Sequence, residues 1–389
     1  MVPYACHPAR SRGRLHSEPP SRLRDAFARD RDRLIHATAF RRLRHKTQVF
    51  VAPEGDHFRV RLTHSLEVAQ IARTLARVLA VNEDLAEVVA LGHDVGHPPF
   101  GHSGEEALAA AMAHVGGFDH NGHALRVLAE LELRTPAFAG LNLSWEVLEG
   151  LAKHNGPVTG TPGWALAEVD AAFPLELESW PALEAQLAAL ADDIAYNAHD
   201  LDDALGAGLV DVEEAAAEVP LIGVLWRQVK AEWPGETRRR LLVPQLVREL
   251  IGAMVDSLLA ETRDRLRALS PEFPDDIRRA GRATVAFGPG MEEELAPLRT
   301  FLRARMYEAA SVQALREPAA AVVRGLFAAL QADPARLPGR WRALHAEAAP
   351  DVADRVIGDF IAGMTDRYAI RTHAELTGTN PMPADLALF

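Results

Sequence analysis

The chain has 389 residues and 48% of them are hydrophobic, so it is long enough to bury a sizeable core as one large domain or two ordinary ones. The sequence contains no apolar run near the roughly 20 residues of a membrane helix and no signal-peptide pattern, which excludes membrane-spanning and secreted proteins. Its single cysteine, Cys6, excludes a disulfide framework, and we expect a cytoplasmic protein.

The charge is distributed unevenly along the chain. The formal net charge is −12, yet residues 1–62 hold 14 Lys and Arg against 6 Asp and Glu, which leaves −20 for the remainder. A basic N-terminal segment could bind nucleic acid, pair with acidic surfaces of neighbouring subunits, or supply arginines to a polyphosphate. A solvated or self-paired face is the simplest interpretation, so charge alone does not identify a partner.

Two helices are predicted before residue 95. Thr63 is the expected cap of the first, and the apolar spacing that follows turns His64 toward the inside of the protein. Asn82 is the expected cap of the second, which ends at the pair His93-Asp94 because a glycine and two prolines follow. The His-Asp pair therefore lies at the end of a helix that opens into a turn.

A third helix is predicted to begin at His102, because Ser103 and Glu106 have the form of a capping box. A helix N-terminus favours anions such as phosphate. His102 and Glu105 then share one face, where an imidazole partnered by a carboxylate can exchange protons near neutral pH. Ordinary helix capping explains Glu105 equally well, since it lies near the positive end of the helix dipole.

A long apolar stripe predicts a helix over residues 183–205. At about 100° per residue, Asp193 lies beside this stripe and Asp192 points the opposite way, so we choose Asp193 as a candidate metal ligand. Helical patterns recur to the end of the chain, no strand series is evident, and the sequence predicts an all-α protein. The C-terminal patterns cover residues 241–269, 295–312, 319–332 and 352–368.

Four side chains in the order His…His-Asp…Asp could hold one divalent cation: His64, His93, Asp94 and Asp193. Such a set leaves coordination positions open for water and a phosphate oxygen, as a metal-dependent phosphohydrolase needs. A structural zinc site is the alternative, but it generally recruits cysteines, which this region lacks. The ion could be Mg, Mn, Fe, Co or Zn. Arg61, one turn before His64, either binds phosphate or lies at the surface.

Several motifs extend this pattern over most of the chain, and the run His93-Asp94-Val95-Gly96-His97-Pro98-Pro99-Phe100-Gly101-His102 is the most distinctive. The combination resembles the deoxyguanosinetriphosphate triphosphohydrolase-like proteins of the HD superfamily from about Arg22 to Tyr368. The segments that carry the resemblance are 29–36, 39–50, 61–68, 93–102, 118–121, 153–156, 191–196 and 361–368.

The resemblance implies an all-helical, metal-dependent hydrolase that cleaves a deoxynucleoside triphosphate between the α-phosphate and the 5′ oxygen. The products would be deoxynucleoside and tripolyphosphate, and the substrate dGTP or several dNTPs. The implied metal ligands are His64, His93, Asp94 and Asp193. The residues implied around the α-phosphate are His97, His120 and the expected catalytic pair His102 and Glu105. The implied substrate contacts are Arg61, Gln48, Val49, Tyr196 and Asp200.

The resemblance also implies a homo-oligomer and, as in some relatives, an activating nucleotide or single-stranded DNA. We expect residues 1–21 to be a disordered or loosely packed leader and residues 22–389 to form a single all-α domain. Within it, the HD core would span about 58–206 and a C-terminal helical extension about 207–389. The alternatives are an HD-type nucleoside monophosphatase or phosphodiesterase, or a nucleotide- or nucleic-acid-binding regulator with weak catalysis.

Overall fold

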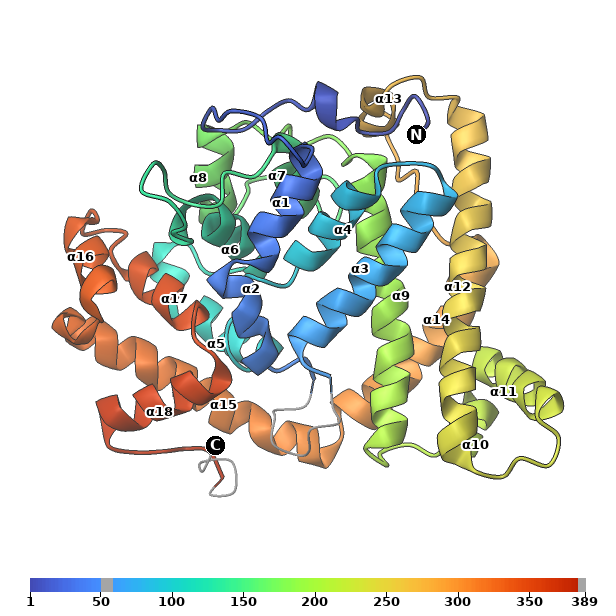
Figure 1. Cartoon of the computed structure of the whole chain (residues 1–389). Helices are drawn as coiled ribbons and strands as arrows, with labels where there is room; N and C mark the ends of the chain where they lie inside the picture. The colour runs from blue at the N-terminus through green and yellow to red at the C-terminus, as the bar shows by residue number, and fades with distance from the viewer. Residues whose placement is uncertain (50–58, 384–389) are drawn as a thin grey trace. The chain divides into compact units, whose positions relative to one another are not determined.

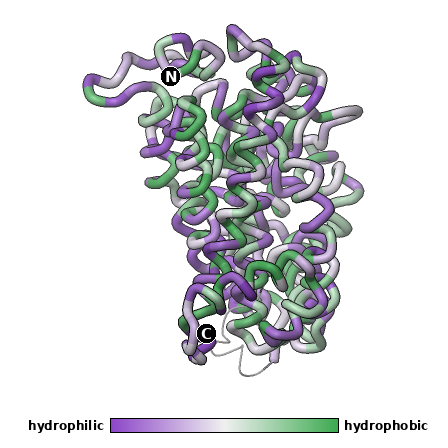
Figure 2. Tube along the Cα trace, turned by 90° about the vertical axis from the view of Figure 1, so that its right-hand side faces the viewer, coloured by the Kyte–Doolittle hydropathy of each residue, from purple (hydrophilic) through white to green (hydrophobic). Residues whose placement is uncertain are grey.

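The computed structural model describes residues 1–49 and 59–383, which form helices joined by turns (Figure 1). These residues contain 18 α-helices and no strand, with only isolated β-bridges, so the predicted all-α class is confirmed. Hydrophobic and hydrophilic stretches alternate along the trace (Figure 2), as expected for helices that each bury one face. None of the described helices combines the length and the apolar character that a membrane span requires.

Contacts between Cα atoms group the chain into two compact units. The first unit comprises Met1–His7, Glu67–Ala90 and Trp180–Gln313, and the second comprises Pro8–Leu66, Leu91–Ser179 and Ala314–Phe389. The predicted division into one domain with an HD core and a C-terminal extension stays a prediction.

The first unit is built around a long helix, α9 (Leu183–Gly206), which agrees with the helix predicted over 183–205. It packs against α12 and α14, and α11 packs against both of these. Glu184, near the start of α9, is buried and accepts hydrogen bonds from the backbone N–H groups of Cys6 and Asn82. The remaining helices of this unit are α10 (Val212–Glu218), α11 (Pro220–Glu232), α12 (Arg239–Leu269), α13 (Pro274–Arg278), α14 (Pro289–Leu302), and most of α3 (Arg61–Val78) and α4 (Glu83–Gly92).

The second unit combines N-terminal, central and C-terminal helices in one core. Leu108 of α5 and Met112, the residue directly after that helix, pack in the same buried cluster as residues of α15 and α17. A Cβ on Gly358 would lie 2.2 Å from Sδ of Met112, so the Met112 side chain packs directly on the backbone of α17 at this glycine. The helices are α1 (Ala26–Ile35), α2 (Thr38–Arg42), α5 (Gly101–Ala111), α6 (His120–Arg126), α7 (Trp145–Ala152), α8 (Trp164–Ala172), α15 (Ala310–Ala332), α16 (Gly339–Glu347), α17 (Asp354–Ala362) and α18 (Asp366–Thr377).

The residues expected to form a loose leader make specific contacts. Arg14 is paired with Asp30, which is fully buried in α1 and also accepts the backbone N–H of Ser144 at 2.9 Å. Cys6 is buried and bonded to Glu184, as described above. Residues 1–21 therefore have at least two specific attachments. Cys6 is bonded within the first unit and Arg14 within the second.

The start of α3 differs from the prediction, whereas the cap of α4 agrees with it. Because α3 begins at Arg61, Thr63 lies inside the helix, where its hydroxyl donates to the carbonyl of Val60. Asn82 caps α4 as predicted, since its Oδ1 accepts the N–H of Leu85 at 2.9 Å.

The capping box predicted for α5 is wrong. The helix begins at Gly101, directly after Phe100, whose backbone is left-handed with φ 64°. Ser103 therefore lies inside the first turn and does not cap the helix. His102 still lies at the helix N-terminus, as expected.

The helix predicted over 352–368 is two helices. α17 ends at Ala362 and α18 begins at Asp366, because the hydroxyl of Thr365 accepts the N–H of Tyr368 and starts a new helix. The helix predicted over 295–312 is likewise interrupted by a π-helical turn at Arg303–Tyr307.

Candidate active site

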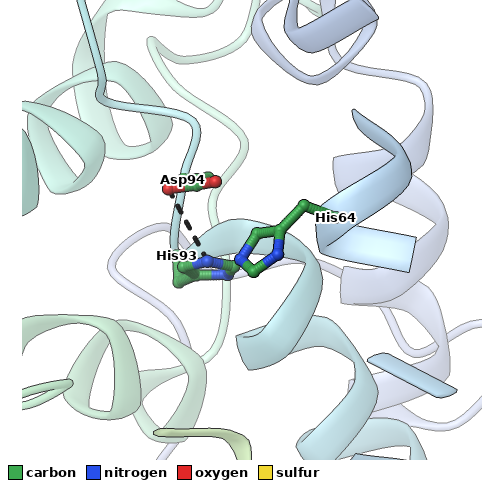
Figure 3. A group of neighbouring side chains, drawn as sticks. All are labelled: His64, His93 and Asp94. Carbon is green, nitrogen blue, oxygen red and sulfur yellow. Dashed lines mark ion pairs between the residues drawn. The ribbon is translucent and has the colours of Figure 1, made fainter. Parts of the chain in front are cut away.

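The ends of two helices bring three potential metal ligands together (Figure 3). His64 lies in the first turn of α3, and His93 and Asp94 follow directly after α4. One ligand atom from each of the three side chains lies within 4.8 Å of the others. All three residues are buried, with exposed fractions of 3% to 6%. Three of the four predicted ligands therefore form one cluster.

A tight turn fixes the orientation of the His-Asp pair. The N–H of Val95 donates to the carbonyl of Gly92 at 3.3 Å, and the N–H of His97 donates to the carbonyl of Asp94 at 3.2 Å. These bonds replace the helical pattern of α4 and direct successive side chains to different sides of the turn. The glycine and prolines in this part of the sequence thus have the expected effect.

The donor set fits a divalent cation. Oδ2 of Asp94 is buried and has no hydrogen-bond partner among the described residues, which is costly for a carboxylate oxygen. Two imidazoles and a carboxylate are a mixed set that suits Mn, Fe, Co or Zn, and the carboxylate also suits Mg. A cation held by this cluster would give Oδ2 of Asp94 the partner that it lacks.

The other oxygen of Asp94 is surrounded by basic groups. Arg61 donates to Oδ1 at 2.8 Å, and Nδ1 of His97 lies 3.0 Å from the same atom. Burial opposes ionisation of Asp94, but Arg61, His93 and His97 together hold the pKa of this carboxyl well below its usual range. Asp94 is therefore an anion, as a metal ligand must be.

A second group of titratable side chains adjoins the first through His97. Oε1 of Glu105 lies 2.8 Å from Nδ1 of His120 and also accepts the backbone N–H of His120 at 2.9 Å. The rings of His97 and His120 stack with their centroids 3.8 Å apart. Burial opposes ionisation of Glu105, but its bond to His120 lowers the pKa of Glu105 to about 2. Glu105 is therefore a carboxylate at neutral pH.

His102 lies beside this second group. Its ring centroid is 6.3 Å from that of His97. Helical spacing predicted that Glu105 shares a face with His102 and partners its imidazole. In the structure, Glu105 forms its hydrogen bond with His120. Burial, followed by the charge of Arg61, lowers the pKa of His102. Its imidazole is neutral at pH 7 in the free protein.

Gln48 and Val49, which were predicted to contact the nucleoside, are both half-buried. Oε1 of Gln48 has no hydrogen-bond partner among the described residues. A Cβ on Gly101 would lie 3.6 Å from the backbone oxygen of Gln48, so the Gln48 backbone runs beside the start of α5. Phe50, which ends the segment 39–50 of the resemblance, lies outside the described residues.

Known proteins share both the HD region and the rest of the chain. Residues 61–197 match the HD domain model, and residues 285–375 match the phosphohydrolase-associated domain model. Relatives named deoxyguanosinetriphosphate triphosphohydrolase-like protein include one from Caulobacter sp. (strain K31), 52% identical over 96% of both chains. Another, from Bradyrhizobium sp. (strain ORS 278), is 51% identical over 98% of this chain and 97% of its own. A third, from Cereibacter sphaeroides (strain ATCC 17025 / ATH 2.4.3), is 49% identical over 97% and 100%.

The chain belongs to the deoxyguanosinetriphosphate triphosphohydrolase-like family. The resemblance found in the sequence is therefore confirmed. Membership makes the protein an HD phosphohydrolase, a hydrolase of phosphoester bonds, and HD domains are metal-dependent. Two groups among the described residues could hold a metal ion: His64, His93 and Asp94, and the second group of His97, Glu105 and His120.

Three further predicted residues of this triphosphohydrolase-like chain lie on α9, in the first unit. Asp193 is exposed and Asp192 is half-buried, which is the reverse of the order expected from the helical stripe. Asp200 is buried and accepts a hydrogen bond from the hydroxyl of Tyr307. The ring of Tyr196 stacks on that of Tyr307 with centroids 6.3 Å apart. The roles of Asp193, Tyr196 and Asp200 stay predictions.

Sequence reasoning assigned no role to two residues that contact the site. The ring of His154 stacks on that of His93, with centroids 5.3 Å apart and planes at 17°. Lys46 is buried, and its Nζ donates to the carbonyl of His97. His154 is one of the many histidines in this region, and Lys46 is one of several basic residues in its segment, so neither stands out by spacing.

Gly96 sets how closely the His-Asp turn approaches α6. A Cβ at this position would lie 2.0 Å from the carbonyl oxygen of His120 and 2.4 Å from the backbone nitrogen of Ala124. Nδ1 of His123 also lies 2.9 Å from the carbonyl of Gly96. The turn that carries Asp94 thus touches the backbone of the helix that carries His120.

We predict that Gly96→Ala lowers the free energy of unfolding by about 2–3 kcal/mol, because two backbones must move apart. It should also weaken metal retention, since the turn that holds Asp94 shifts. Urea unfolding and metal analysis after gel filtration would measure both effects. Gly252→Ala in α12 is the matched control, because its Cβ would meet nothing within 4 Å. Equal stability of the two variants would contradict the prediction.

Proposed function

We propose that this protein is a metal-dependent dNTP triphosphohydrolase that converts dGTP or several dNTPs to deoxynucleoside and tripolyphosphate. The observation that carries the proposal is the double use of Asp94. It belongs to the cluster that fits a cation, and it also contacts His97, the first member of the second titratable group. A metal site and a set of proton-transfer groups therefore share one buried anion.

The relatives support the choice of substrate. Their name refers to triphosphohydrolysis of deoxyguanosine triphosphate, and the similarity to them covers nearly all of this chain. The motifs outside the His-Asp pair are what distinguish this function from that of an HD-type monophosphatase or phosphodiesterase.

His64, His93 and Asp94 would hold the cation, and we propose Asp193 as the fourth ligand. When bound, a divalent cation supplies Lewis-acid stabilisation of the charge that develops on the phosphoryl group. Arg61 orients Asp94 through its bond to Oδ1, while its own Nε is buried without a partner among the described residues. That N–H is a donor for a phosphate oxygen.

The reaction breaks the bond between the α-phosphorus and the 5′ oxygen. A water oxygen bonds to the α-phosphorus and becomes part of tripolyphosphate, and the water gives up a proton; the leaving 5′ oxygen takes one up, so the proton that its donor gives is replaced overall by the one that water releases. We assign the proton taken up by the 5′ oxygen to His102, because the negative charge of a bound triphosphate raises the pKa of a nearby imidazole. Glu105 holds a proton on Nδ1 of His120, which leaves Nε2 of His120 to face the substrate.

The remaining predicted contacts complete the proposal. Gln48 and Val49 would contact the nucleoside, and Tyr196 and Asp200 the sugar. A homo-oligomer and an activating nucleotide or single-stranded DNA remain predictions, as does the cytoplasmic location.

A product assay tests the proposed reaction. Protein loaded in turn with Mg, Mn, Fe, Co or Zn is given each dNTP singly and all four mixed, and nucleoside, monophosphate, pyrophosphate and tripolyphosphate are resolved. We expect equal amounts of deoxynucleoside and tripolyphosphate. Monophosphate with pyrophosphate would show cleavage at another bond and reject the proposal. Turnover of monophosphates alone, or binding without turnover, would support the phosphatase or the regulator instead. Activity only with mixed dNTPs would reveal an activator.

We predict that His93→Ala and Asp94→Ala each abolish metal retention and lower kcat by about a thousandfold, because several kcal/mol of charge stabilisation are lost. Metal content is measured by mass spectrometry and kcat by the product assay. His114→Ala is the matched control, since His114 is exposed and paired with Asp354. Retention of full activity by either metal-site variant would be incompatible with the proposed site.

The fourth ligand is tested by comparing Asp193→Asn with Asp192→Asn. We predict that Asp193→Asn loses metal and activity, because the helical stripe selects Asp193, and that Asp192→Asn keeps both. Metal content is compared at equal protein concentration. Loss of metal in Asp192→Asn alone would transfer the ligand role to Asp192, in agreement with its smaller exposure.

We predict that His102→Ala lowers kcat by about 10²–10⁴-fold without loss of metal, as expected for removal of a proton donor. Glu105→Gln should also lower kcat, because it removes the carboxylate that holds the proton on His120. Steady-state kinetics and metal analysis check both variants. Glu106→Gln, an exposed neighbour on the same helix, should have no effect. Unchanged kcat in His102→Ala would remove it from the mechanism.

A further inference from the structure

One buried carboxylate joins two segments of the candidate site that are far apart in the sequence. Asp366, the first residue of α18, has an exposed fraction of 6%. Its Oδ2 accepts the backbone N–H of Thr47 at 2.9 Å and also the hydroxyl of Thr47. Its Oδ1 accepts the backbone N–H of Phe100 at 2.9 Å. Both carboxylate oxygens are therefore occupied by donors from other segments.

The two donors adjoin residues with different proposed tasks. Thr47 directly precedes Gln48, the proposed nucleoside contact. Phe100 directly precedes the first turn of α5, which carries His102 and Glu105. Asp366 thus connects the segment for the nucleoside to the segment for the α-phosphate.

The turn at the start of α5 is conformationally costly. Phe100 and Gly101 have successive left-handed backbones, with φ of 64° and 56°. A left-handed conformation is disfavoured for a residue with a Cβ, and it persists only where the surroundings hold it. The bond from the N–H of Phe100 to Asp366 is one such restraint, and it acts two residues before His102.

Lys46 strengthens the same connection. Its Nζ donates to the carbonyl of His97 and, at 2.8 Å, to the carbonyl of Ala362 at the end of α17. Residues 46 and 47 are therefore both bonded to the α17–α18 region, and Lys46 is bonded to the segment 97–100 as well. These two adjacent residues thus fix the position of their own segment relative to residues 97–100 and to the α17–α18 region.

We propose that Asp366 is a positioning residue for dNTP recognition, which holds Thr47 and hence Gln48 in fixed register with the turn that starts α5. This inference rests on the proposed function. The nucleoside contact and the groups around the α-phosphate keep their separation only while Asp366 binds both segments. Asp366 itself does not touch the substrate.

A double-mutant cycle between Asp366→Asn and Gln48→Ala tests the inference. Asparagine has the same shape but replaces one acceptor oxygen with an NH₂ donor. Either Thr47 or Phe100 then has its N–H facing another donor instead of an acceptor. We expect Asp366→Asn to raise KM for the preferred dNTP about tenfold, with metal content unchanged and a smaller effect on kcat. Gln48→Ala should raise KM in the wild type but add little in Asp366→Asn, because Gln48 is already displaced.

Glu184→Gln is the matched control. Glu184 is also a buried carboxylate, and its Oε1 accepts backbone N–H groups from two distant segments, at Cys6 and Asn82. It should lower stability without changing KM, and its effect should add to that of Gln48→Ala. A merely structural role for Asp366 would give the same additive result.

Thr47→Val keeps the test decisive if Asp366→Asn does not fold. It removes only the hydroxyl bond to Asp366 and should raise KM about threefold. When it is combined with Gln48→Ala, the two effects on KM should again be smaller than their sum. Unchanged KM, or additive effects, in folded variants that retain metal would overturn the inference and leave the proposed function intact. Absence of dNTP cleavage by the metal-loaded wild type would instead overturn the proposed function, and this inference with it.

Discussion

The site depends on a single buried anion, Asp94. A carboxylate removed from water would normally take up a proton, and here Arg61 and His97 on Oδ1 prevent this. Oδ1 also lies 3.6 Å from Nε2 of His93, while Oδ2 is buried without a hydrogen-bond partner among the described residues. Arg61 therefore does for Asp94 what solvent does for an exposed carboxylate, but in one fixed direction. Loss of that guanidinium would alter both the metal site and the histidines next to it.

Local sequence signals identified the elements that carry the metal ligands. The cap at Asn82, the helix stop after Gly92 and the long stripe of α9 all depend on residues within one or two turns of each other. His64, His93 and Asp94 could therefore be grouped by their positions along the chain. The choice between Asp192 and Asp193 as the metal ligand could not be settled in the same way. A helical wheel gives the direction of a side chain around its own helix, but not how far neighbouring elements cover it.

The predictions that failed depend on distant partners. The start of α5 was misplaced because Phe100 adopts a left-handed backbone bonded to Asp366, which lies 266 residues away. Helical spacing did not reveal the hydrogen bond from Glu105 to His120, because His120 arrives from α6; the pairing of His102 with Glu105 in catalysis stays a prediction. The helix expected over 352–368 was too long because Thr365 restarts it. His154 and Lys46 lie in segments that carry the resemblance but received no role, since their contacts with His93 and His97 exist only in the folded chain.

The packing of α5 has a consequence for how this protein can be divided. The apolar side of α5 at Leu108, together with Met112 directly after the helix, is covered by C-terminal helices that lie beyond the region matched by the HD domain model. An excised fragment of residues 61–197 would expose that side to water and favour self-association. The HD region therefore relies on helices outside its own boundaries to bury the apolar side of α5.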